Sequence, residues 1–133
     1  MSTILVNTLT GTSTAGSIAV TGEGNSTTTN LQQGLCKGWV NFVGTGTVSI
    51  SDSFNTASLT DVATGKYDNN YTNNMNSASY VGHVCSDAAS SNDGFNRIAS
   101  GTIATTKVEL RHYEANSLTD TLLMVGSVDG DLA

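Results

Sequence analysis

Short runs of alternating apolar and polar residues, separated by turn-forming residues, organise most of this chain. The clearest run lies at residues 47–54, where Val48, Ile50 and Phe54 alternate with Thr and Ser residues, and a second lies at residues 107–113. Alternation with a period of two is typical of a strand with one buried face. No longer window shows the 3.6-residue period of an amphipathic helix. The pattern predicts an all-β protein.

About seven strands are expected after residue 33, with turn signals between them. Among them are residues 39–43, 59–62, 67–71 and 80–85. The sequence Gly-Thr-Gly at 44–46 predicts a hairpin turn before the run at 47–54. This spacing of strands and turns is typical of an antiparallel β-sandwich or a small jelly-roll. Residues 34–133 are therefore predicted to form one such domain.

Residues 1–33 differ from the rest of the chain. They hold two short apolar clusters, Ile4–Leu5–Val6 and Ile18 with Val20, each followed by a stretch rich in Thr and Gly. This segment has too little apolar surface for a core of its own, and its Thr, Val and Ile content favours extended chain over a flexible linker. It is predicted to be an extended assembly arm that adds strands to the same domain or to a neighbouring subunit.

Aromatic residues in or beside the strand patterns are expected to pack in the core. Trp39, Phe42 and Ile50 are the expected packing residues of the 39–54 hairpin. Tyr67 and Tyr71 lie beside the polar sequence Asp-Asn-Asn-Tyr-Thr-Asn-Asn. If they are exposed, they could stack on sugar rings, which makes them candidate glycan contacts.

Composition and charge narrow the range of partners. The chain carries a formal net charge of −6 with only five Lys and Arg residues, so neither nucleic acid nor an anionic membrane is an expected partner. No apolar run approaches the length of a membrane span, and the N-terminus shows no signal peptide. Synthesis in the cytoplasm is expected. The 16 Ser, 20 Thr, 13 Asn and 14 Gly residues reinforce the all-β prediction, because they disfavour helix interiors.

Candidate catalytic and metal-binding residues are few. The two histidines are His83 and His112, and His112 belongs to an alternating strand pattern. His83 and Cys85 would project from one face of a strand and could bind a metal together with Cys36, but no paired cysteine signature is present. Cys36 and Cys85 could alternatively form one disulfide or remain two thiols. No phosphate loop or dinucleotide fingerprint occurs, so no enzyme activity, cofactor or metal is predicted.

The stretch from residue 25 to about residue 85 carries a family resemblance. Its motifs are Thr-Asn-Leu-Gln-Gln-Gly-Leu at 29–35, Lys-Gly-Trp-Val-Asn-Phe at 37–42, Gly-Thr-Gly-Thr-Val at 44–48, Ser-Phe-Asn at 53–55, Ser-Leu-Thr-Asp at 58–61, Gly-Lys-Tyr at 65–67 and Tyr-Val at 80–81. In these motifs the chain resembles a domain frequent in structural and tail-fibre-like proteins of marine and freshwater bacteriophages. The resemblance implies an all-β domain of a virion, often trimeric. Gly38 and Cys36 depart from the family's pattern.

These observations lead to one main hypothesis and its rivals. The main hypothesis is a non-enzymatic virion structural protein, a small decoration or fibre component that associates with copies of itself and with capsid or tail proteins. The rival is a carbohydrate-binding receptor tip, with contacts from Tyr67, Tyr71, His83 or the loop at 86–94. A subunit of an extracellular helical filament is the other alternative.

Overall fold

The computed structural model describes residues 3–12, 18–21, 28–31, 34–87, 94–130 and 132. The described residues form antiparallel strands and no helix, which confirms the predicted all-β class. The chain divides into two compact units, Met1–Leu35 and Cys36–Ala133. The boundary predicted between residues 33 and 34 lies two residues before this division.

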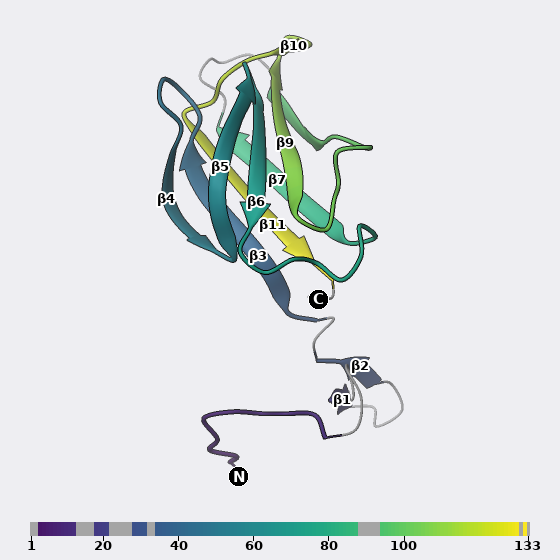
Figure 1. Ribbon diagram of the computed structural model, residues 1–133. Helices are drawn as coiled ribbons and strands as arrows, with labels where there is room; N and C mark the ends of the chain where they lie inside the picture. Colours follow the sequence, from purple (N-terminus) through teal and green to yellow (C-terminus); the bar gives the residue numbers. More distant parts are fainter. Residues whose placement is uncertain are drawn as a thin grey trace. The chain divides into compact units, whose positions relative to one another are not determined.

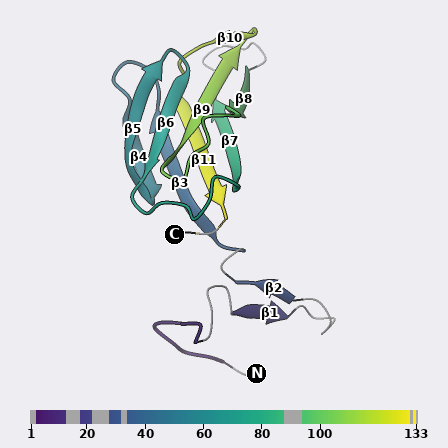
Figure 2. The same cartoon turned by 45° about the vertical axis from the view of Figure 1, so that its right-hand side comes forward.

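The second unit contains two sheets that face each other, as Figure 1 shows for β5, β6 and β9 in front of β3, β11 and β7. The five-stranded sheet has the order β10-β9-β6-β5, and β8 also pairs with β9 (Figure 2). Its strands are β5 (Thr56–Ala63), β6 (Lys66–Tyr71), β8 (Gly94–Ile98), β9 (Lys107–Glu114) and β10 (Ser117–Leu118).

The four-stranded sheet has the order β4-β3-β11-β7, and all its neighbours are antiparallel. Its strands are β3 (Cys36–Val43), β4 (Ser49–Phe54), β7 (Val81–Asp87) and β11 (Leu123–Asp129). The chain therefore forms the predicted β-sandwich. The jelly-roll connectivity and the assembly role of the N-terminal segment stay predictions.

The core lies between the two sheets and is filled by the inward residues of alternating strands. Its buried members are Val40, Phe42, Tyr67, Tyr71, Met75, Tyr80, Val108, Leu110, Met124 and Val128. The expected alternation of β9 is confirmed, because its even-numbered residues from Val108 to His112 are buried and face the other sheet. Phe42 and Tyr67 meet edge to face with ring centroids 5.1 Å apart, a favourable geometry for aromatic pairs.

A β-bulge corrects the predicted faces of β4. The alternation at 47–54 predicts that Ile50, Asp52 and Phe54 share one face. In the structure Ile50 lies opposite Phe42, whereas Asp52 lies opposite Asn41, with a register shift between these pairs. One extra residue in a strand moves the following side chains to the other face. Asp52 and Phe54 are therefore on the outer face, which removes the apparent conflict of an aspartate in the core.

The first unit holds a separate two-stranded sheet. Strand β1 (Ala19–Thr21) pairs antiparallel with β2 (Thr28–Asn30), and Leu31 N donates a hydrogen bond to Ile18 O at 2.8 Å. The extended chain predicted for this segment is present as two strands that pair with each other inside the first unit. The residues between the two strands lie outside the described part of the chain.

Candidate binding face of the four-stranded sheet

The outer face of the four-stranded sheet carries one row of residues that crosses all four strands. Phe54 on β4 pairs with Trp39 on β3, Trp39 pairs with Ser127 on β11, and Ser127 pairs with His83 on β7. Residues paired in this way project from the same face of a sheet. We call these four residues the aromatic row. With strands about 4.8 Å apart, it spans about 14 Å.

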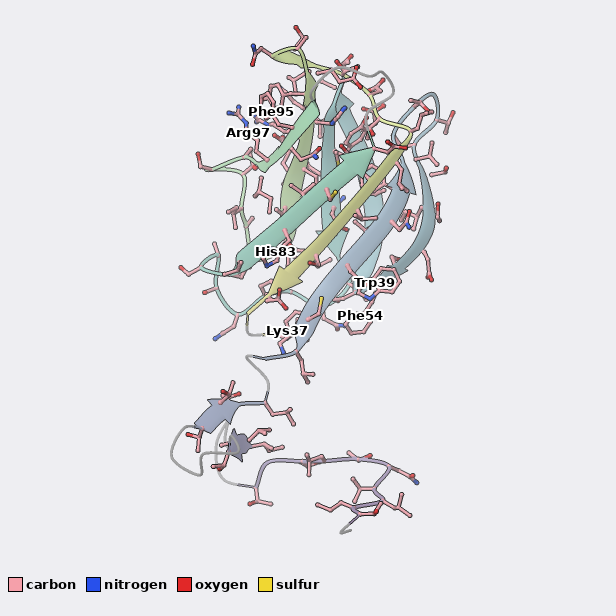
Figure 3. The ribbon with its side chains drawn as sticks, turned by 180° about the vertical axis from the view of Figure 1, so that it is seen from behind. Lys37, Trp39, Phe54, His83, Phe95 and Arg97 are labelled. Atoms are coloured by element: carbon pink, nitrogen blue, oxygen red, sulfur yellow. The ribbon has the colours of Figure 1, made fainter. Side chains whose placement is uncertain are left out.

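A shallow groove with a volume of about 340 Å³ lies along the centre of this face. Its outward-pointing lining residues are Trp39, Asn41, His83, Cys85, Val125 and Ser127. The groove arises because the central strand β11 presents the small side chains of Val125 and Ser127, while β3 and β7 present the larger Trp39 and His83. Figure 3 shows Trp39 beside Phe54 on one side of the face and His83 on the other.

Polar groups accompany the aromatic rings. His83 Nε2 lies 3.6 Å from Asp129 Oδ2, and the His83 side chain is 67% exposed. Asn41 Oδ1 is buried and accepts no hydrogen bond. A buried acceptor without a partner loses free energy relative to the same group in water. The groove thus combines an exposed aromatic edge, a carboxylate–imidazole pair and one amide with unused capacity.

Two predictions about core packing are wrong. Trp39 is not a core residue, because β3 buries Gly38, Val40 and Phe42 and turns Trp39 outward, where it is partly exposed. Ile50, at the edge of the sheet, is 39% exposed, and of the three expected packing residues only Phe42 is fully buried.

Tyr67 and Tyr71 cannot be glycan contacts, because they are 0% and 6% exposed and belong to the core. Tyr67 Oη lies 3.0 Å from both Gly44 O and Asp120 Oδ1, the two acceptors for its single proton, and Tyr71 donates to Tyr80 Oη at 3.0 Å. Burial raises the pKa of both phenols. Among the polar neighbours that suggested exposure, Asp68 and Asn70 lie on the other face of β6, whereas Asn69 shares the core face and is itself buried, 3% exposed. The loop at 86–94 falls mostly outside the described residues.

The aromatic row was missed from the sequence, although a signal for it exists. The alternation of β3 gives two possible faces, Gly38–Val40–Phe42 and Trp39–Asn41–Val43. The size of Trp favours assigning it to the core, and the bulge in β4 hides the fact that Phe54 accompanies it. An aspartate two residues before Phe54 was the one sequence feature that argued for an outward face.

His83 and Cys85 do project from one face of β7, as predicted. Cys36 and Cys85 are both free thiols, so the disulfide alternative is not realised. Within the described residues, no group of three or more His, Cys, Asp and Glu side chains could hold a metal ion.

A second polar cluster lies between the sheets. His112 is fully buried, and its Nδ1 lies 2.8 Å from Ser86 Oγ and 3.1 Å from Asn96 Oδ1, while its Nε2 lies 3.4 Å from Glu114 Oε1. A serine, a histidine and a carboxylate that contact one another in this order are the components of a hydrolase triad. Here Ser86 Oγ also lies 2.7 Å from Asn96 Oδ1, and the imidazole has no exposed surface. The cluster joins β7 of one sheet to β8 and β9 of the other.

Comparison with known protein families, with characterised proteins and with solved structures finds no match.

The apolar residues of the predicted arm are mostly exposed. Ile4, Leu5 and Val6 have exposed fractions of 85%, 90% and 60%, and Val20 is 53% exposed. Ile18 is intermediate in burial. None of these five belongs to the hydrophobic core cluster of buried residues.

No helix in the described part of the chain is long and apolar enough to cross a membrane.

Proposed function

We propose that this chain is a non-enzymatic structural protein of a bacteriophage particle, a small decoration- or fibre-type component that associates with copies of itself through its N-terminal unit. The observation that supports this most directly is the exposure of Ile4 and Leu5, which exceeds four fifths for each side chain. Burying an aliphatic side chain of this size against a partner stabilises by about 1.5–3 kcal/mol. An extended segment that carries several such side chains gains by lying against a second chain.

The composition of the chain also suits repeated assembly. Its surface is rich in Ser, Thr and Asn and poor in long charged side chains, which lose more conformational entropy when an interface orders them. We expect a trimer or a higher homo-oligomer, bound in turn to capsid or tail proteins of the particle. An assembly whose contacts do not close would instead run on as a helical filament.

Deletion of residues 2–30 tests this proposal when the molar mass is measured by light scattering. The full chain is expected to form an oligomer, and the deleted chain a monomer with an unchanged free energy of unfolding of the sandwich. A finer variant replaces Ile4, Leu5 and Val6 by Asn, and its matched control replaces the neighbouring Asn7 and Thr8 by Ser. An oligomer that survives the deletion unchanged would contradict the proposal.

Carbohydrate binding is the second candidate function, and the aromatic row favours it. Trp39 and the 51% exposed Phe54 form an aromatic surface beside a groove with hydrogen-bonding groups. Apolar faces of sugar rings pack on such rings, while hydroxyl groups can bond to the side-chain amide of Asn41, which lines the groove, and to the His83–Asp129 pair. Neutral sugars fit this mixture of aromatic and polar groups.

A glycan array with the full chain tests the second candidate. Trp39→Ala and Asn41→Ala are expected to abolish a glycan signal, whereas Leu123→Ala, on the same face but outside the groove lining, is expected to retain it. Because Trp39 points outward, its truncation leaves no cavity in the core, and the variant should remain folded. A signal that Trp39→Ala and Asn41→Ala leave intact would exclude this groove as the site.

A further inference from the structure

The positive charges of this acidic chain are concentrated on one surface. Of its five Lys and Arg residues, four lie on the outer face of the five-stranded sheet: Lys66, Arg97, Lys107 and Arg111. Among the described residues of the sheet, the carboxylates that share this face with them are Asp68 and Glu109. Four cations against two carboxylates leave this surface positive, although the whole chain has a net charge of −6.

Three of the cations form a single row across adjacent strands. Lys66 on β6 pairs with Arg111 on β9, and Arg111 pairs with Arg97 on β8. We call these three residues the cationic row. Like charges placed directly opposite each other destabilise a sheet, so the arrangement has an energetic cost in the free protein. The row extends over two strand spacings, about 10 Å.

Two of the three cations of the row, Lys66 and Arg97 at its ends, remain available to an anion. Arg111 donates a hydrogen bond from Nε to Glu109 Oε1, which raises the pKa of its guanidinium, and Lys107 Nζ lies 2.6 Å from Asp68 Oδ2. Lys66 and Arg97 form no ion pair with any described residue. Arg97 instead lies over the ring of Tyr113, 4.8 Å from its centroid. An anion bound at the row would therefore meet two uncompensated cations.

An apolar row runs beside the cationic row. Leu118 on β10 pairs with Tyr113 on β9, and Tyr113 pairs with Phe95 on β8. The rings of Phe95 and Tyr113 are stacked with an interplanar angle of 2°, and Phe95 is 43% exposed. Figure 3 shows Phe95 and Arg97 next to each other at the edge of the domain. Phe95 and Arg97 are two residues apart on β8 and project from the same face, so a cation and an exposed aromatic ring are neighbours on this surface.

We propose that this face binds an acidic polysaccharide, whose carboxylate or sulfate groups lie on the cationic row while a sugar ring packs against Phe95. A guanidinium group matches the geometry of a carboxylate or sulfate, and an ammonium group supplies a compact second charge. A row of separated cations suits a polymer with repeated anionic groups better than one small ion. The site is independent of the self-association proposed above and lies on the opposite sheet from the groove.

Nucleic acid is a poorer fit for the same face. A phosphate backbone requires a broad basic surface, whereas here Asp68 and Glu109 border the row directly. Single-stranded DNA is therefore the appropriate competitor in a binding test.

Binding of the full chain to dextran sulfate, polygalacturonate, neutral dextran and single-stranded DNA, measured by isothermal titration calorimetry at low ionic strength, tests the proposal. We expect binding to one or both acidic polysaccharides, with no binding to neutral dextran and weaker binding to DNA. Comparing the sulfated with the carboxylated polymer identifies which group the row accepts. Raising the salt concentration to about 1 M should weaken binding by more than tenfold, because exposed charges are then screened.

Matched variants localise the interaction. Lys66→Gln and Arg97→Gln are each expected to weaken binding several-fold, and their combination by more than about tenfold. Lys107→Gln removes the same charge from the same face but from a cation already paired with Asp68, and it should weaken binding less than twofold. Equal losses in all three single variants, absence of binding to both acidic polymers, or preference for DNA would each overturn the proposal.

Discussion

Asn55 and Asn73 are joined by two hydrogen bonds at the bend where the chain passes from one sheet to the other. Asn55 Oδ1 accepts a hydrogen bond from Asn73 N at 2.7 Å, and Asn55 Nδ2 donates to Asn73 O at 3.0 Å and to Lys37 O at 2.9 Å. Asn55 is the single residue between β4 and β5, and its φ of 59° lies in the left-handed region. It therefore fixes the corner at which the two sheets separate.

Replacement of Asn55 tests this role. Asn55→Ala loses the three side-chain hydrogen bonds and places a non-glycine residue in the left-handed region, so we expect a loss of about 2–3 kcal/mol in the free energy of unfolding. Asn55→Gly loses the same bonds without the conformational strain and should be milder by about 1 kcal/mol. Urea unfolding of both variants measures the difference. If alanine proves as mild as glycine, the backbone conformation does not limit this position.

The sequence predicted the β-class and the strand faces of β7 and β9, because each depends on local alternation. It did not predict the corner at Asn55, although the motif Ser-Phe-Asn was conspicuous. The contacts of Asn55 reach residues 18 positions away in both directions, and no local pattern records them. The aromatic row was missed for a similar reason, since a bulge in one strand decides which side of the sheet Phe54 occupies.

Gly44 is a position where the fold tolerates no side chain. A Cβ atom there would lie 2.5 Å from Tyr67 Oη and 2.7 Å from Tyr67 Cζ, and the Tyr67 ring is fully buried against Phe42. Gly44→Ala is expected to reduce the free energy of unfolding by about 2–3 kcal/mol through overpacking. The measurement is chemical denaturation followed by Trp39 fluorescence or circular dichroism.

Two further variants separate steric overlap from a general effect of alanine. Gly46→Ala meets no atom within 4 Å, so only its φ of +67° should matter, with a loss of about 1 kcal/mol. Tyr67→Phe removes the phenol oxygen that lies nearest to the added methyl group. In that background Gly44→Ala should cost at least about 1 kcal/mol less. Strict additivity of the two substitutions would exclude a direct clash.

Because three tyrosines are buried, we expect the free energy of unfolding to fall at alkaline pH. Burial raises the pKa of Tyr67, Tyr71 and Tyr80 above its ordinary value of 10.0. The folded state therefore retains these protons at a pH at which the unfolded chain releases them. This contribution is complete below about pH 10 and is lost as the pH rises toward the folded-state pKa, by up to about 1.4 kcal/mol per pH unit for each tyrosine.

Urea unfolding at several values between pH 8 and pH 11, together with tyrosinate absorbance, measures this effect. Tyr71→Phe keeps the buried ring and removes one of the ionising groups, so the decline above pH 10 should become shallower. Tyr71 also loses its hydrogen bond to Tyr80 in this variant, which should cost about 1 kcal/mol at neutral pH. A free energy of unfolding that stays constant up to pH 11 would contradict the assignment of these phenols to the core.

The Ser86–His112 contact provides the last prediction, because it separates a structural cluster from a catalytic one. Ser86 belongs to β7 and His112 to β9, so their 2.8 Å contact joins the two sheets through a fully buried imidazole. Ser86→Ala should reduce the free energy of unfolding by about 1–2 kcal/mol, since it leaves buried polar groups of His112 and Asn96 short of one partner. Ser127→Ala, on the outer face of the neighbouring strand, is the matched control and should change it by less than about 0.5 kcal/mol. A fluorophosphonate probe, which labels activated serines, is expected to leave Ser86 unmodified in the folded chain. Labelling of Ser86 that disappears in a His112→Gln variant would instead assign the cluster to acyl transfer.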